Sequence, residues 1–240
     1  MLDETRLQQE EPARFTRAWT GLMGLSLLWG LACIALYAVC WRIFGDSTGI
    51  PLVPAAAVLA ASAMGLYRRA LASLAQLLGR DRPTETATAA ALIVAVLAML
   101  LLGLRSWKSD LPFNWWLALI RPEMLFRALL LAPLWGGWSM LATCQLRWNR
   151  PCRDAITRAL AAGGGFLAAP AMLVALLVLT IVYFNHLPWT QLSIAATGAL
   201  GAVAAGWLTT RLEQGLTRRS LLAANLLTQM AFLLAYLANR

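Results

Sequence analysis

One charged stretch between two apolar segments reads Gly65-Leu66-Tyr67-Arg68-Arg69-Ala70-Leu71-Ala72-Ser73-Leu74-Ala75-Gln76-Leu77-Leu78-Gly79-Arg80-Asp81. Its apolar side chains recur at i, i+3, i+4 and i+7, the spacing of one helix face, at Leu71, Leu74, Ala75 and Leu78. Arginines stand at both ends of this face, and Arg82 follows directly. A helix with an apolar face and cationic ends is typical of a segment that lies along a membrane surface. We therefore predict an interfacial helix here.

The overall composition is that of a membrane protein. Of the 240 residues, 60% are hydrophobic and 13% are charged, and the mean hydropathy is +0.65. A soluble chain carries about 25% charged residues. Residues 1–18 are polar and partly acidic, unlike the basic start of a cleavable signal peptide. We expect them to form an amphipathic cytoplasmic lead-in to a single membrane domain at 19–240.

Seven apolar runs predict an all-α, polytopic membrane domain with about seven transmembrane helices plus interfacial helical segments. The expected spans are 19–41, 50–67, 88–104, 124–146, 163–184, 189–209 and 220–237. Residues 45–49 are expected to form a turn after the first span. The mixed aromatic and basic residues at 105–123 predict a segment at the level of the lipid headgroups.

Two of the predicted spans carry a face suited to contact with another helix. Gly198, Ala202 and Gly206 are spaced by four residues in the sixth span, which predicts close approach of a neighbouring helix. Asn225 and Gln229 lie one turn apart in the last span. We expect these two amides to hydrogen-bond to a neighbouring helix, because polar groups within a membrane need partners.

The distribution of basic residues predicts the orientation. If the amino terminus is cytoplasmic, residues 1–18 and the loops 68–87, 147–158 and 210–219 carry fourteen basic residues on that side. The opposite side carries five, and Arg127 lies within the fourth span, close enough to its edge to reach the interface. This excess follows the positive-inside rule. We expect a multi-pass protein of a bacterial-type cytoplasmic (inner) membrane with a cytoplasmic amino terminus.

Metal and nucleic-acid sites are not expected. The net charge is +9, but its arginines are spread over several loops rather than gathered on one soluble face, which argues against nucleic acid as a partner. His186 is the only histidine. The four cysteines lack metal-ligand spacing and are expected to be packed thiols, at Cys33, Cys40, Cys144 and Cys152. The expected partners are the lipid bilayer and either another membrane protein or a second copy of the chain.

Residues 65–81 resemble a motif of adenosylcobinamide-GDP ribazoletransferase, also called cobalamin synthase. The family motif has the form G-L-H-L-D-G-L-A-D-T-A-D-G-L-F-G-G-R-D. This chain has two residues fewer before Gly79. The residues that match the motif are Gly65, Leu66, Leu71, Ala72, Ala75, Leu78, Gly79, Arg80 and Asp81. A second family motif, R-R-L-G-G-L-T-G-D-x-x-G-A-x-N-E-L, resembles 211–225, and a weaker likeness covers 127–158. The resemblance implies a membrane enzyme with a cytoplasmic-facing Mg²⁺ site that attaches the lower nucleotide of cobalamin.

The chain departs from the family at the acidic residues. The family's aspartates fall on Arg69, Ser73, Gln76 and Arg219, and its Asn-Glu pair falls on Asn225-Leu226. Arginine cannot ligate a metal, because it is cationic and offers no acceptor. These replacements predict that the chain has no catalytic residue and no resident metal or other cofactor. If the family's activity is nevertheless retained, Mg²⁺ would be its cofactor and the nearby carboxylates of Asp81 and Glu85 its remaining ligands.

The arginines offer a different chemistry, because guanidinium groups make bidentate contacts to phosphate oxygens. The candidate anion-binding residues are Arg68, Arg69, Arg80, Arg82, Arg218 and Arg219. The same residues are also typical of loops that set topology and touch anionic lipid headgroups. The favoured function is a non-catalytic relative of cobalamin synthase, acting as a membrane subunit or binding a phosphorylated ligand at its cytoplasmic face. The alternatives are an active ribazoletransferase and a transporter or channel subunit, although the spans contain few of the ionisable residues that ion pathways use.

Overall fold

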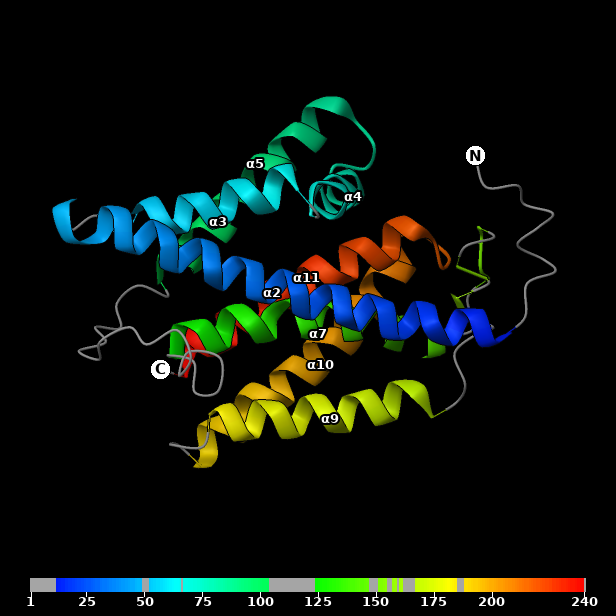
Figure 1. Ribbon diagram of the computed structural model, residues 1–240. Coiled ribbons are helices and arrows are strands. Elements are labelled where there is room, and N and C mark those ends of the chain that lie inside the picture. The colour runs from blue at the N-terminus through cyan, green and yellow to red at the C-terminus, as the bar shows by residue number, and fades with distance from the viewer. Residues whose placement is uncertain are drawn as a thin grey trace.

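The computed structural model of the protein describes residues 12–48, 52–65, 67–103, 124–146, 151–154, 157–158, 160–161, 167–184 and 188–239. Over these residues the secondary structure is helical, apart from one isolated bridge between Cys152 and Leu216. The main helices are α2 (Pro12–Thr48), α3 (Leu52–Met64), α4 (Arg68–Leu78), α5 (Pro83–Gly103), α7 (Met124–Leu146), α9 (Ala168–Tyr183), α10 (Pro188–Leu212) and α11 (Arg218–Ala238) (Figure 1). The prediction of an all-helical membrane domain is confirmed for this part of the chain.

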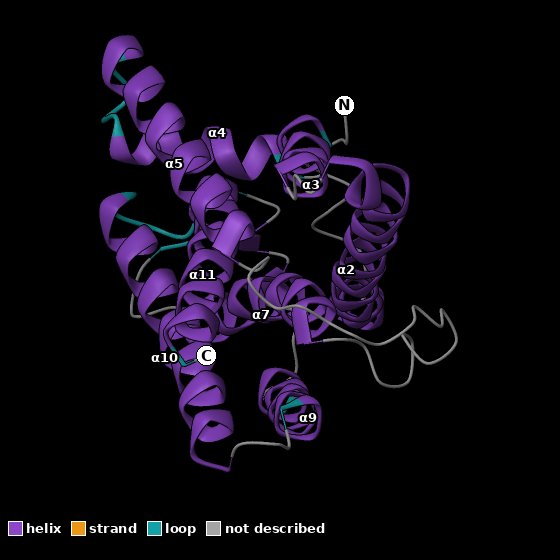
Figure 2. Ribbon diagram, turned by 90° about the vertical axis from the view of Figure 1, so that its left-hand side faces the viewer, coloured by secondary structure: helices purple, strands orange, loops and turns teal. Residues whose placement is uncertain are grey.

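The long helices form a single bundle around α7. Helix α7 packs against α2, α9, α10 and α11, and it lies at the centre when the bundle is viewed along its length (Figure 2). Its residues 126–139 are all buried. Because α7 is covered by other helices rather than by lipid, it can carry hydroxyl groups, and Ser139 and Thr143 donate to carbonyl oxygens of their own helix at 2.7 and 2.6 Å.

In the part of the chain that the structure describes, five helices are long and apolar enough to cross a membrane. Their apolar segments are Trp19–Cys40, Pro83–Leu102, Phe126–Leu146, Leu192–Leu212 and Arg218–Ala238. The expected second and fifth spans correspond to α3 and α9, which have only 13 and 16 residues. At the rise of an α-helix these two extend about 20 and 24 Å, which is less than the hydrocarbon core of about 30 Å. The chain is therefore a multi-pass membrane protein by helix length and composition.

Several helix boundaries differ from the predicted ones. The predicted turn at 45–49 is wrong in part, because α2 continues to Thr48 and no proline interrupts the chain between Pro12 and Pro51. Helix α5 begins at Pro83 rather than at residue 88, since proline suits the first turn of a helix, where its missing N–H leaves no bond unmade. The lead-in residues 1–11, the segment 105–123 and His186 lie outside the described residues.

The close helix contact predicted from small residues is confirmed at Gly198. Gly198, Ala202 and Gly206 are all buried. A Cβ added to Gly198 would lie 2.8 Å from the ring of Trp135 on α7. Glycine at this position therefore lets α10 approach α7 closely enough to cover a tryptophan that is fully buried.

Arg127, which we expect near the membrane interface, is buried and contacts the end of α9. Its side chain is only 8% exposed, and its Nη1 donates to the carbonyl oxygen of Tyr183, the last residue of α9. The final carbonyls of a helix lack partners within the helix and carry partial negative charge, so they attract a cation. Arg127 thus joins the beginning of α7 to the end of α9.

Candidate functional site

Helix α4 lies across one end of the bundle, as the interfacial prediction requires. It is seen end-on in Figure 1 and from the side in Figure 2, where the long helices are seen nearly end-on. Its inner face packs on α5 and α11 and buries Leu74 and Ala75, each 1% exposed. Leu71 is half-buried. Leu78, the fourth residue of the predicted face, is 50% exposed, so the buried face ends one turn earlier than predicted.

The corner between α4 and α5 contacts the beginning of α11. The Nη1 atom of Arg219 donates to both carboxylate oxygens of Asp81, at 2.9 and 3.2 Å. The same nitrogen lies 3.4 Å from Oε1 of Glu213. Asp81 and Arg219 are 138 positions apart in sequence. The structure therefore brings together the two stretches that carry the strongest motif resemblance, 65–81 and 211–225.

A third stretch, 151–158, joins the same region. The Arg153 amide donates to the carbonyl of Leu216, and the Leu216 amide donates to the carbonyl of Pro151, both at 3.0 Å. Asp154 then accepts from two amides, through Oδ2 from Arg218 at 2.8 Å and through Oδ1 from Thr157 at 2.7 Å. Its carboxylate lies at the N-terminus of α11, where the helix dipole favours negative charge.

Asp154 is a residue that the sequence analysis missed, because only the arginines of this loop were considered. The sequence did contain a signal for it. Aspartate side chains often accept from nearby backbone amides, and Asp154 is followed three residues later by Thr157, whose amide it accepts from.

The beginning of α11 is fixed by its own side chains. Thr217 is the N-cap residue, and its hydroxyl accepts from the Ser220 amide at 3.0 Å. In return, the Ser220 hydroxyl accepts from the Thr217 amide at 3.0 Å. This reciprocal capping box satisfies two amides that the helix itself cannot. It also defines the position of Arg218 and Arg219 on the first turn.

The six candidate arginines lie on segments at the same end of the bundle, and two of them are paired. Arg219 is bound by Asp81 and Glu213, and Arg82 pairs with Glu85 at 2.8 Å. The other four are exposed, and the described part of the chain shows no ion pair to their side chains, at Arg68, Arg69, Arg80 and Arg218. This end can therefore offer unpaired guanidinium groups to an anion.

The positions of the family's acidic residues do not form a metal site. Arg69 is exposed, whereas Ser73 is buried and donates to the carbonyl of Arg69 at 2.7 Å. Asn225 lies in the bundle interior, 7% exposed. The described residues contain no group of three or more histidines, cysteines or carboxylates that could hold a metal ion. Asp81 and Glu85, the carboxylates expected to bind Mg²⁺ if the family's activity were retained, are both paired with arginines.

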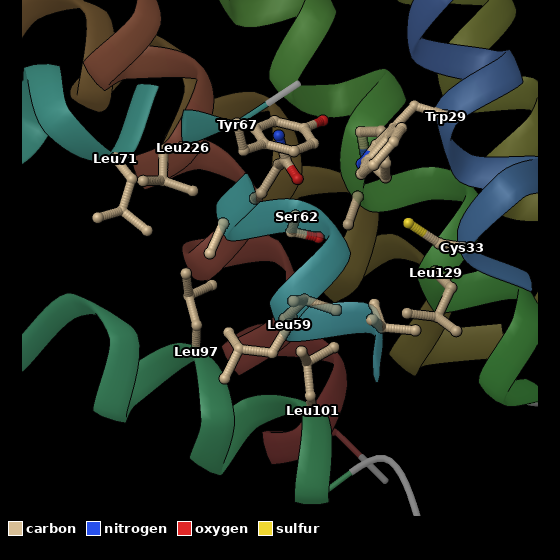
Figure 3. A pocket seen from close by; sticks show the side chains of 16 residues that line it. Trp29, Cys33, Leu59, Ser62, Tyr67, Leu71, Leu97, Leu101, Leu129 and Leu226 are labelled. Atoms are coloured by element: carbon tan, nitrogen blue, oxygen red, sulfur yellow. The ribbon is translucent and has the colours of Figure 1, made fainter. Parts of the chain in front are cut away.

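A small cavity of about 60 Å³ is lined by residues of α2, α3, α5, α7 and α11 and by Leu71 of α4 (Figure 3). Most of its lining is apolar, and Ser62, Tyr67 and Gln229 contribute polar groups. A buried water needs about 10 to 15 Å³ and two or more polar partners. The cavity is therefore large enough for a few water molecules at its three polar groups.

Tyr67 connects this cavity to the amides of α11. It follows α3, is 8% exposed and meets the ring of Trp29 edge-on, with centroids 5.7 Å apart. A side-chain hydrogen bond joins its phenol to Gln229.

The predicted pairing of the two amides on α11 with a neighbouring helix is confirmed for Asn225, whereas Gln229 bonds to Asn225 within α11. Gln229 Nε2 donates to Asn225 Oδ1, and Asn225 Nδ2 donates to the sulfur of Met140 on α7 at 3.3 Å. A Cβ on Gly136 of α7 would lie 2.8 Å from both amide groups. Glycine there gives the two amides the space to lie between α7 and α11.

Comparison with known proteins yields no relative. The chain matches no family model, and no curated protein and no solved structure matches it significantly. The resemblance to cobalamin synthase therefore rests on the motif residues in 65–81 and 211–225 and stays a prediction.

Proposed function

We propose that this protein is a multi-pass inner-membrane protein whose cytoplasmic end binds a phosphate-bearing anion. The observation that carries the proposal is the meeting of three distant stretches, 65–82, 151–158 and 211–219, at one end of the bundle. Over the described residues, these stretches carry nine arginines and three carboxylates. An excess of guanidinium groups from separate segments suits phosphate, because each group can make a bidentate contact.

The proposed topology has seven spans, with α3 and α9 crossing together with the five longer helices. Two observations support it. Helices α2, α3, α5, α7, α9, α10 and α11 run in alternating directions through the bundle (Figure 1). The arginine-rich loops then fall on one side, as the positive-inside rule requires. A bilayer can thin locally around short helices at modest cost.

Topology is tested by labelling single cysteines. The four native cysteines are first replaced by alanine, and one cysteine is then placed at Arg150 or at His186. We expect an impermeant thiol reagent to label the two positions from opposite faces of the membrane, with Arg150→Cys reached only from the cytoplasm. Labelling of both positions from the same face would contradict the seven-span topology.

Anion binding is tested with inorganic pyrophosphate, by calorimetry on the protein in phosphatidylcholine nanodiscs. Binding should weaken steeply with salt, because the proposed contacts are exposed and electrostatic. The double variant Arg69→Gln/Arg218→Gln should lose most of the affinity. Arg240→Gln is the matched control, since it removes a positive charge beyond α11, which ends at the opposite end of the bundle (Figure 1).

The phosphate could belong to a soluble ligand or to a lipid headgroup, and the nanodisc composition separates the two. If the site takes lipid phosphates, phosphatidylglycerol in the nanodisc should compete with pyrophosphate. If the ligand is soluble, the affinity should depend little on the lipid. The absence of binding to pyrophosphate and of any effect of phosphatidylglycerol would contradict the proposal.

We further propose that the chain is a non-catalytic relative of cobalamin synthase. The contact of Asp81 with Arg219 favours this relationship. The stretches 65–81 and 211–225, which resemble the two family motifs, would have to meet if they formed a single site. The purified protein should show no Mg²⁺-dependent transfer or hydrolysis of a GDP-activated corrinoid. Turnover above a control without protein would overturn the proposal in favour of an active ribazoletransferase.

A further inference from the structure

The stretches 65–82, 151–158 and 211–219 form what we call the charged end of the bundle. Among its described arginines, Arg219 contacts the most carboxylates. Its Nη1 contacts Asp81 at 2.9 Å and Glu213 at 3.4 Å, so two carboxylates share one guanidinium. The Arg219 side chain nevertheless remains 37% exposed, and that of Asp81 is 65% exposed. A dissolved anion can therefore reach the same guanidinium and replace the exposed carboxylate.

The backbone holds Asp81 in this position. Arg80 and Asp81 have φ values of 49° and 60°, a left-handed conformation that is unfavourable for residues with a side chain. The corner is fixed on both sides, since the Asp81 amide donates to the carbonyl of Gln76 at 3.1 Å. Gly79 packs against the backbone of Thr86, where a Cβ would lie 2.4 Å from the amide nitrogen. Unfavourable conformations of this kind occur often at ligand sites.

We propose that Asp81 is an internal competitor at the anion site, occupying the group of Arg219 that a phosphate-bearing ligand would use. This inference rests on the proposed anion binding. Carboxylate and phosphate oxygens accept from a guanidinium in the same way. A ligand with one negative charge has little electrostatic advantage over Asp81. A ligand with two or more charges, such as a diphosphate, can displace Asp81 and also contact other arginines. Asp81 thereby sets a preference for polyanions.

The test compares two variants that lose the same charge from the same corner. Asp81→Asn removes a carboxylate from Arg219, whereas Glu85→Gln removes one from Arg82. In phosphatidylcholine nanodiscs, Asp81→Asn should bind inorganic pyrophosphate about fivefold more tightly, the factor expected on removing one exposed competing charge. Glu85→Gln frees Arg82 but leaves both carboxylates on Arg219, so it should change the affinity less than about twofold. The preference for pyrophosphate over inorganic phosphate should fall in Asp81→Asn alone.

The outcomes separate this inference from the proposed function. If the unmodified protein binds pyrophosphate but Asp81→Asn binds no more tightly than Glu85→Gln, the inference is overturned and anion binding stands. If no variant binds pyrophosphate, Asp81→Asn included, both are overturned. Should Asp81→Asn fail to fold, Glu213→Gln removes the second carboxylate from Arg219 and should tighten binding about twofold. An unchanged or weaker affinity in Glu213→Gln would then overturn the inference.

Discussion

The centre of the bundle and its charged end are held together by different kinds of contact. At the centre, Trp135 is fully buried against Gly198 of α10 and stacks on Phe232 of α11, with ring centroids 6.4 Å apart. At the charged end, the side chains of Arg82 and Glu85 form an ion pair while remaining 70% and 43% exposed. The centre therefore depends on shape, whereas the charged end depends on electrostatic contacts that water and salt weaken.

This difference separates stability from ligand binding. Changes of a single methyl group should disturb the centre, because close-packed interiors have no free volume to absorb them. Changes of charge at the charged end should leave the stability of the fold nearly unaffected. They should mainly alter which anions the protein binds. The following predictions test this division, from the largest expected effect on stability to the smallest.

The largest loss of stability is expected for Gly198→Ala. The added Cβ would lie 2.8 Å from the ring of Trp135, which is enclosed on all sides and cannot move away easily. Overpacking of this kind costs about 1 to 3 kcal/mol. Thermal unfolding in detergent micelles measures the loss. Gly24→Ala is the matched control on α2, because nothing lies within 4 Å of its new Cβ, and it should be neutral or slightly stabilising.

A smaller loss is expected for Gln229→Met, which keeps the side-chain volume but removes the amide. Asn225 Oδ1 would lose its donor and Tyr67 its hydrogen-bonding partner, at a cost of about 1 to 2 kcal/mol. Thr228→Val is the control, since the Thr228 hydroxyl bonds only to the carbonyl of Ala224 within α11, at 2.8 Å. Equal losses in the two variants would show that the contact between α7 and α11 does not depend on the amide pair.

The parts of the fold that could be predicted from sequence are those with local causes. Helix α7 begins at Met124 and ends at Leu146, as its apolar run predicts. The inner face of α4 follows from its helical periodicity, because only that face can be buried. The predicted ends were poorest for α2, which runs from Pro12 to Thr48 rather than over 19–41. An apolar run shows which part of a helix avoids water, but it does not fix where the helix begins and ends.

The contacts of the charged end could be predicted only in part. The distribution of basic residues predicts that Asp81 and Arg219 lie on one side of the membrane, but no local pattern predicts that side chains 138 positions apart will touch. The contact of Asp154 with Arg218 depends on the same tertiary arrangement, and so does the cavity beside Tyr67. In each case the sequence identifies the residue type, whereas its partner comes from the packing of distant helices.

Loss of the carboxylate at the start of α11 should have an intermediate effect. Asp154→Ala removes the acceptor for the amides of Arg218 and Thr157, and losing a capping residue typically costs about 1 kcal/mol. The effect should be local, so hydrogen exchange should rise in 151–158 and in the first turn of α11 more than in α7. Asp154→Asn keeps one acceptor oxygen and should lose less. Uniformly faster exchange throughout the bundle would contradict this local role.

The smallest effect is expected at the exposed ion pair between Arg82 and Glu85. A double-mutant cycle with Arg82→Gln and Glu85→Gln should give a coupling energy of about 0.2 to 0.5 kcal/mol, the usual range for exposed pairs three or four residues apart on a helix. Molar salt should abolish this coupling, because it screens exposed charges over a few ångströms.

The same double-mutant cycle on Asp81 and Arg219 should give a larger coupling energy, since Arg219 is less exposed than Arg82. If the coupling of Arg82 with Glu85 instead exceeded that of Asp81 with Arg219, the α4–α5 corner would be stabilised by its own ion pair rather than by its contact with α11. The charged end would then be a local structure, independent of the bundle to which α11 belongs.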